Sequence, residues 1–348
     1  MIARLKSAGA RTLSLLLIPA SIVPVLLVVP QIAESHRLFD RRHNSGPIAP
    51  PEVVLSANQK ARLQPVAPYA GKGSVPVLAY GQVTDSRDAG PLAVTRRAFA
   101  EQMAALRQMG FRSIATGDYL RLRRGDTRGL PERPILITFD GGRLNSYRGT
   151  DRVLQRYGFQ ATMFVATADV RREDPKFLTW RELKDMDRSS RWDIQPLAHD
   201  GYRRVASNER GDMAPFYAVR RFTASEGLET FADYERRVTE DVFDVREALE
   251  DQGFDPQALA VPEGNYGQLG SNDQAIAPFM RGLLARQFGA FFTRDAKNDP
   301  GYAGADAEAE RYVVGRATTT DRLYMWLRDH SPGAARPDHR PKRRRSHR

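Results

Sequence analysis

The sequence predicts an α/β fold built on parallel strands, which follows one N-terminal transmembrane helix. The helix is indicated by residues 12–33, which carry no charge over more than the ~20 residues that a bilayer requires. From residue 75 onward, about seven strand-like segments alternate with helical ones. One of these strands, residues 134–140, ends on Asp140 and two glycines, and α/β proteins place functional groups at such strand ends. The alternation by itself favours either a parallel α/β barrel or an open doubly wound sheet.

The N-terminal segment predicts a membrane attachment. Arg4, Lys6 and Arg11 precede the apolar residues "TLSLLLIPASIVPVLLVVPQIA". A signal-peptide core usually has roughly 7–15 residues, so residues 1–33 are expected to form a basic N-terminus and an uncleaved signal anchor, with a cleaved signal peptide as the alternative. The expected location is the cell membrane, with a single span and an extracytoplasmic domain. Residues 34–74, rich in proline, predict a linker between the anchor and the domain.

Charge and composition narrow the classes of partner. The formal net charge is +11, and the stretch 331–348 contains seven of the Lys and Arg residues but only one Asp. This basic tail is expected to be disordered. It could also bind anionic lipid or an anionic wall polymer. No nucleic-acid partner is expected, because no recognition motif accompanies the charge. The absence of cysteine excludes disulfides, thiolate nucleophiles and zinc held by cysteine.

Residues 75–330 predict the folded domain, element by element. A helix over 95–110 illustrates the reasoning, with Phe99, Met103 and Leu106 at helical spacing, Thr95 as its N-cap and Gly110 as its end. Residues 203–230 have weak periodicity and are interpreted as a long insertion or loop. The expected strands lie at 75–81, 111–116, 134–140, 160–166, 192–197, 258–264 and 290–294, and residues 311–319 close the domain before its last helix. The expected helices lie at 95–110, 117–125, 145–158, 178–186, 231–253, 272–289 and 321–330.

Five stretches of the domain resemble the polysaccharide deacetylase family, also called NodB-homology or carbohydrate esterase family 4. They are "VPVLAYGQV", "FAEQMAALRQMGFRSI", "PILITFDGG", "VLQRYGFQATMFV" and "LTWRELKDM", in the family's order and spacing. The branch that acts on poly-β-1,6-N-acetylglucosamine looks closest. The resemblance covers roughly residues 75–330 and implies a distorted parallel (β/α)7-type barrel with its site at the carboxyl ends of the strands. It also implies hydrolytic N-deacetylation with a divalent metal that polarises the amide carbonyl and activates a water.

The resemblance assigns roles to several residues of this sequence, and most of the metal ligands are missing. Asp140 stands at the position of the general base. Gly141 stands where the family has a metal-binding aspartate, and Leu197 and Tyr202 stand where its branch has two histidines. His199 is the only histidine of this motif, and the domain's other histidine lies at its very end, in the last helix. The expected protein is therefore a catalytically impaired member or a pseudoenzyme, with no cofactor.

Alternatives remain open for the individual residues. Asp140 is either a base or a strand-end carboxylate that caps the following turn or helix. An altered metal site could use His199 with Asp140, Asp200 and Glu263, and an active enzyme would then hold Zn, Co or Ni. Other candidate substrate-binding residues are Tyr147, Trp180 and Glu263, although Trp180 also fits a packing position on its helix. The expected partner is an extracellular polysaccharide. A membrane glycosyltransferase or an active deacetylase is the partner if the protein is a scaffold.

Overall fold

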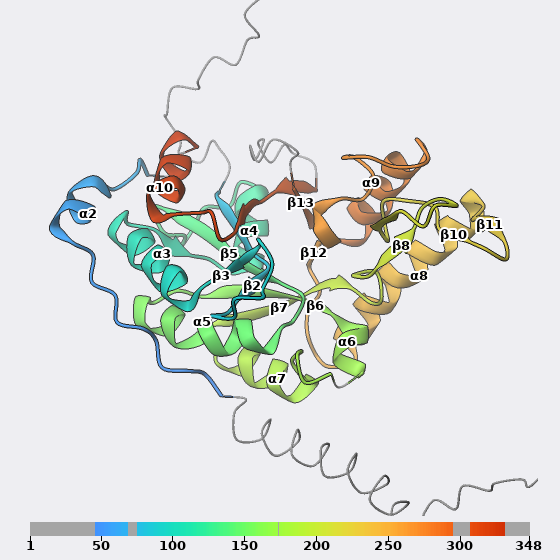
Figure 1. Cartoon of the computed structure of the whole chain (residues 1–348). Coiled ribbons are helices and arrows are strands. Elements are labelled where there is room, and N and C mark those ends of the chain that lie inside the picture. Colours follow the sequence, from blue (N-terminus) through green and yellow to red (C-terminus); the bar gives the residue numbers. More distant parts are fainter. Residues whose placement is uncertain (1–45, 69–74, 173, 295–306, 331–348) are drawn as a thin grey trace, which may run out of the picture. The chain divides into compact units, whose positions relative to one another are not determined.

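The computed structural model describes residues 46–68, 75–172, 174–294 and 307–330 (Figure 1). The chain divides into two compact units, Met1–Gly46 and Pro47–Arg348, and every element given below belongs to the second unit. These elements form an α/β fold with parallel sheets, as the alternating pattern predicted.

Two parallel sheets form the centre of the fold. The first has the order β15-β1-β5-β6-β7, with β4 paired to β5, and the second has the order β12-β13-β14. The strands of the first sheet are β1 (Val77–Tyr80), β4 (Arg112–Ser113), β5 (Pro134–Asp140), β6 (Ala161–Ala166), β7 (Trp192–Ala198) and β15 (Tyr312–Val314). Those of the second are β12 (Ala258–Ala260), β13 (Ala290–Thr293) and β14 (Glu308–Glu310).

Helices follow most of the strands. They are α2 (Ala57–Arg62), α3 (Arg96–Gln108), α4 (Thr116–Arg123), α5 (Leu144–Tyr157), α6 (Thr167–Arg171), α7 (Trp180–Arg188), α8 (Phe231–Glu250), α9 (Ile276–Gln287) and α10 (Thr320–Asp329), with a short 3₁₀ helix η1 (Pro262–Gly264). Local sequence explains several ends: Thr95 accepts a hydrogen bond from Ala98 at the start of α3, and Gly158 ends α5 in the left-handed conformation. The helices predicted over 95–110 and 145–158 are therefore confirmed, as α3 and α5.

Alternation along the strands divides the apolar residues between two faces. On β5, Ile135 and Ile137 pack with helices α3, α5 and α10, whereas Leu136 belongs to an inner cluster with Phe164, Leu197 and other strand residues. A third cluster surrounds α8 and α9. The inward-facing side of β5 is the one that carries Asp140 at its carboxyl end.

Two links connect the sheets to each other. On one side the chain runs from β14, paired with β13, directly into β15, paired with β1, and Arg311 is the residue between them. On the other side β7 and β12 pack together without a backbone ladder. There the Gln195 side chain accepts hydrogen bonds from the backbone of Gln257 and Ala258, and donates one to the carbonyl of Asp255. The strands therefore follow one another in a ring.

Short strand pairs complete the fold. The region 203–230, predicted as an insertion or loop, contains two antiparallel pairs: β8 (Arg204–Ala206) with β9 (Met213–Pro215), and β10 (Phe222–Thr223) with β11 (Gly227–Leu228). A parallel pair, β2 (Gln82–Val83) with β3 (Ala93–Val94), follows β1.

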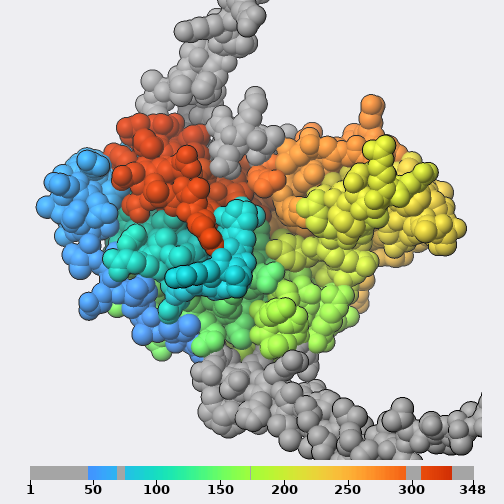
Figure 2. Space-filling view, viewed as in Figure 1, coloured from blue at the N-terminus to red at the C-terminus, as the bar shows by residue number. Residues whose placement is uncertain are grey.

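The predicted linker over residues 34–74 is wrong for part of its length. Leu55, Leu63 and Val66 are buried in the main core cluster, and helix α2 lies beside α10, where Arg62 and Asp321 approach to 4.0 Å. Figure 2 shows this segment in blue against the red C-terminal helix. Prolines break any periodicity here, but apolar side chains between them still gain free energy by burial.

The predicted transmembrane segment, residues 12–33, lies outside the described residues, as does the basic tail 331–348. Within the part of the chain that is described, no helix has the length and apolarity to cross a membrane.

Candidate functional site

The candidate site lies at the carboxyl end of β5, where the sequence predicted it. Asp140 is the last residue of the strand, and Gly141 follows with φ +95°. That backbone conformation favours glycine, so the turn away from the strand depends on this residue type. The amide of Gly141 donates to the carbonyl of Phe164 on β6, which fixes the turn against the neighbouring strand.

Asp140 is held by Arg311. The two terminal nitrogens of the guanidinium bond its two carboxylate oxygens at 2.7 and 2.8 Å, and one of them also donates to Thr138. The Arg311 side chain is 4% exposed and lies against the rings of Phe164 and Phe292. Its Nε has no hydrogen-bond partner. A two-point pair of this kind fixes the carboxylate in place and neutralises its charge.

Sequence reasoning missed Arg311 as a site residue. It is 171 residues from Asp140 along the chain and lies at the crossing between two sheets. The sequence predicts only that 311–319 closes the domain. In the structure β14 and β15 belong to different sheets, and Arg311 between them points inward to Asp140. Nothing in the local pattern indicates that change of sheet.

The Tyr202 ring packs against Gly141. A Cβ atom at position 141 would lie 3.2–3.5 Å from three atoms of the Tyr202 ring, so the ring fills the space into which a side chain at 141 would extend. Burial raises the pKa of the Tyr202 phenol, and the nearby Asp140 carboxylate raises it further. The phenol therefore keeps its proton at neutral pH.

The loop after β7 places His199 next to this turn. Its Nδ1 lies 2.9 Å from the Thr167 hydroxyl, and its backbone amide donates to Asp241 on α8. The Asp241 carboxylate also accepts the amides of Asp200 and Gly201 and the hydroxyl of Tyr217. Four donors converging on one buried carboxylate hold the loop 199–201 rigidly in place.

Glu263 also reaches the site, through a strained turn in η1. Its φ is +54°, which is uncommon for a residue with a side chain. The carboxylate bonds Arg204 at 3.1 Å, and its charge contributes to the raised pKa of Tyr202. The structure thus brings Asp140, Tyr202 and Glu263 into electrostatic reach of one another.

The remaining carboxylates at these strand ends are paired as well. Asp200 bonds Arg172 at 2.7 Å and Arg203 at 2.8 Å, and Arg172 also bonds Asp169 at 3.0 Å. Burial raises the pKa of Asp169, an effect opposed by Arg172. Each carboxylate that the sequence proposed for an altered metal site is therefore bonded to an arginine.

Residues at the family's metal positions do not fit a divalent metal ion. Gly141 has no side chain, Leu197 is apolar and fully buried, and Tyr202 presents a protonated phenol. Metals of this class take deprotonated carboxylates and neutral imidazoles. In residues 46–68, 75–172, 174–294 and 307–330, no group of three or more potential His, Asp or Glu ligands converges.

Tyr147 and Trp180, predicted as substrate-binding residues, lie elsewhere. Both pack against the core cluster on the helix side of the sheet. The Tyr147 ring meets the edge of Trp192, 6.0 Å away between centroids, at the amino end of β7. Their aromatic character serves packing, since the apolar spacing of α5 and α7 directs them inward to the layer between helix and sheet.

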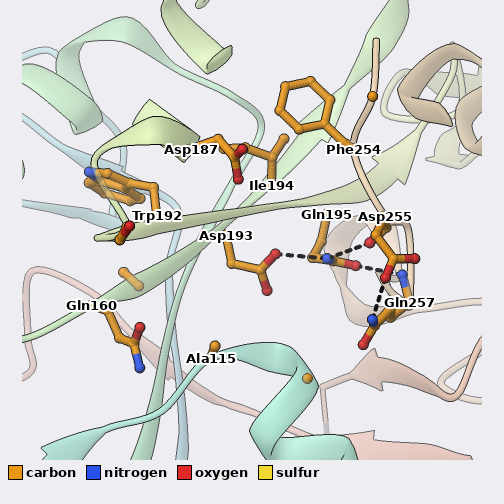
Figure 3. A pocket seen from close by; sticks show the side chains of 14 residues that line it. Ala115, Gln160, Asp187, Trp192, Asp193, Ile194, Gln195, Phe254, Asp255 and Gln257 are labelled. Carbon is orange, nitrogen blue, oxygen red and sulfur yellow. Dashed lines mark hydrogen bonds between the residues drawn. The ribbon is translucent and has the colours of Figure 1, made fainter. Parts of the chain in front are cut away.

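A separate cavity of about 460 Å³ opens at the amino ends of the strands (Figure 3). Asp193 and Gln195 on β7 point into it, and Asp193 accepts hydrogen bonds from Gln195 and from the amide of Thr116. Burial raises the pKa of Asp193. Because Gln195 and its partners link β7 to β12 here, the polar groups of this cavity have a clear structural role.

Comparison with known proteins finds similarity to deacetylases over part of the chain. A model of the polysaccharide deacetylase family matches residues 127–269. The poly-beta-1,6-N-acetyl-D-glucosamine N-deacetylase of Escherichia coli K12 is 24% identical over 196 residues, covering 52% of this chain and 29% of that protein. The chain thus spans less than a third of the length of this curated relative.

Solved structures agree on the fold. A de-N-acetylase from Aggregatibacter actinomycetemcomitans matches with a TM-score of 0.63 at 17% identity, covering 72% of this chain and 99% of that one. IcaB from Ammonifex degensii matches with a TM-score of 0.53 at 23% identity, covering 73% and 96%. At such identities the likeness concerns the fold alone.

Proposed function

The chain contains a polysaccharide deacetylase domain of the NodB type, and from this premise we propose that it binds an N-acetylglucosamine polymer without hydrolysing it. The fold is then a distorted (β/α)7-type barrel, an interpretation supported by the ring order of the two sheets. The polymer binds at the carboxyl ends of the strands, around Asp140 and Tyr202. We also propose, from the sequence, that residues 12–33 anchor the protein in the cell membrane and that the polymer is an exopolysaccharide.

One observation carries the proposal: the Tyr202 ring fills the space next to Gly141. Loss of a single ligand would leave a cavity that another donor or a water could occupy. Here all three ligand positions have changed, and the Tyr202 side chain at one of them packs against Gly141 at another. A packed aromatic ring leaves no room for a metal ion with its water, which hydrolysis of an acetamide by this family requires.

The ion pair of Asp140 supports the same conclusion. A general base must offer a free lone pair to a water. Both oxygens of Asp140 accept hydrogen bonds from the buried guanidinium of Arg311. The guanidinium therefore competes with a water for the lone pairs of this carboxylate.

The decisive experiment measures binding and acetate release on the full-length protein. Calorimetric titration with chitohexaose and with a β-1,6-linked N-acetylglucosamine oligomer is expected to give the same affinity with and without EDTA. Acetate release is expected to stay at the background rate after addition of Zn²⁺, Co²⁺ or Ni²⁺. Acetate in excess of the protein concentration, lost in the double variant Asp140→Leu/Arg311→Met, would establish an active deacetylase instead. Absence of binding to both oligomers would exclude a neutral N-acetylglucosamine polymer as the ligand.

A further inference from the structure

An arginine at the carboxyl ends of the strands forms no ion pair within the described residues. Asp140, Asp169, Asp200 and Glu263 are each bonded to at least one arginine, as described above. Arg143, which directly follows the two glycines of the turn, bonds no carboxylate in the part of the chain that is described. Arg294 at the end of β13 also has no such partner there, but it borders residues 295–306, which are not described. The argument therefore rests on Arg143.

Arg143 is held in position although it lacks an ion pair. Its guanidinium lies over the ring of Phe177, 5.1 Å from the ring centroid. Its backbone forms a bridge with Phe177, and it is the N-cap residue of α5, where no side chain caps the helix. Stacking on an aromatic ring restrains a guanidinium without satisfying its hydrogen-bond donors. Arg143 thus presents oriented donors that the described protein does not use.

A second unused donor lies beside it. The Tyr202 hydroxyl makes no hydrogen bond within the described residues, and its ring packs at Gly141, two residues before Arg143. Burial raises the pKa of Tyr202, and the positive charge of Arg143 acts in the opposite direction. The guanidinium and the phenol are therefore close enough to interact electrostatically. A protonated phenol and a guanidinium both donate, and together they need an oxygen acceptor.

We propose that Arg143 and Tyr202 bind a carboxylate on the glycan, so that the protein prefers an acidic, uronate-containing polysaccharide to a neutral one. A carboxylate supplies acceptors for both donors and also compensates the charge of Arg143, whereas an acetamide carbonyl supplies only acceptors. This inference deepens the proposed function and rests on it, since it assumes that glycan binds at these strand ends.

The test compares a hyaluronan hexasaccharide, in which glucuronate alternates with N-acetylglucosamine, with its methyl ester, in which each glucuronate carboxylate is replaced by an uncharged ester. In ~50 mM salt the native protein is expected to bind the acid about tenfold more tightly than the ester, the value of one charge-assisted hydrogen bond. The preference should shrink at ~0.5 M salt, because the interaction is screened.

Variants assign the preference to the two donors. Arg143→Gln is expected to bring the acid-to-ester ratio close to one. The matched control is Arg152→Gln, which removes the same charge from an exposed arginine further along α5 and should leave the ratio unchanged. Tyr202→Phe keeps the ring against Gly141 and removes only the hydroxyl, so it should weaken binding of the acid by about threefold to tenfold.

The outcomes separate the two proposals. If chitohexaose binds and the native protein does not distinguish acid from ester, the carboxylate inference is wrong and the glycan-binding function stands. If Arg143→Gln keeps the full preference while remaining folded by circular dichroism, the assignment to Arg143 is wrong. If neither hyaluronan nor chitohexaose binds, the proposed function fails and this inference fails with it.

Discussion

The pair between Asp140 and Arg311 makes the sharpest prediction about stability. Asp140→Asn keeps the size of the side chain but removes its charge, and it turns one acceptor oxygen into a donor facing the guanidinium. Arg311 is 4% exposed and its Nε already lacks a partner, so it would be left as a poorly compensated buried cation. Breaking a buried pair on one side costs ~3–5 kcal/mol. Because the Asp140 side chain is 18% exposed, we expect a loss of about 3 kcal/mol, the lower end of that range.

Urea denaturation followed by tryptophan fluorescence measures this cost. Two comparisons isolate the cause. The double variant Asp140→Leu/Arg311→Met removes both charges and is expected to recover most of the lost stability, because a well-packed apolar pair often replaces a buried ion pair without penalty. Glu250→Gln breaks the exposed pair with Arg246 on α8 and should cost no more than ~0.5 kcal/mol.

The reasoning is refuted if Asp140→Asn costs less than about 1 kcal/mol, the range of an ordinary hydrogen bond. It is also refuted if the double variant is less stable than the single one. Either result would mean that the guanidinium finds other partners or water, and that the pair does not hold Asp140 in place.

Three further predictions concern the turn, the link between the sheets and a buried carboxyl. Gly141→Asp restores the family's carboxylate but forces a side chain into φ +95° against the Tyr202 ring. The free energy of unfolding, measured by urea denaturation, should fall by ~1–3 kcal/mol. Adding Tyr202→Ala to this variant should recover part of the lost stability. A cost near zero would show that the turn and ring move freely. Gln195→Leu leaves the backbone amides of Gln257 and Ala258 without acceptors and should lower the free energy of unfolding by ~2–4 kcal/mol. Hydrogen exchange at the Gln257 amide should become faster. Unchanged exchange there would contradict the role of the Gln195 side chain in linking β7 to β12. Burial raises the pKa of Asp193 in the folded protein, so the folded state holds an extra proton between the two pKa values and stability falls as the pH rises through that interval. Asp193→Asn should therefore gain stability relative to the native protein as the pH rises above the ordinary Asp pKa of about 4, and a difference independent of pH would argue against the raised pKa.

The sequence determined the parts of the fold that depend on local pattern. Strand β5 is a run of apolar, mostly β-branched residues ending on a carboxylate and two glycines, and nothing but a strand followed by a tight turn suits it. Helices α3 and α5 were equally clear, because the N-cap Thr95 of α3 and the C-cap Gly158 of α5 agree with the apolar spacing of each helix. The positions of the histidines, with the family resemblance, also indicated that the family's metal ligands are incomplete.

Tertiary structure decided which side chains meet. Arg311 pairs with Asp140 because the chain changes sheet between β14 and β15. Tyr202 packs at Gly141 because Asp241, on helix α8, fixes the loop after β7. The burial of Leu55 and Leu63 in an apparent linker has the same origin. Local pattern is read over a few residues, whereas these contacts join distant segments whose meeting depends on the packing of the whole chain. The sequence therefore located Asp140 and the missing ligands, and only the folded chain decided what took their place.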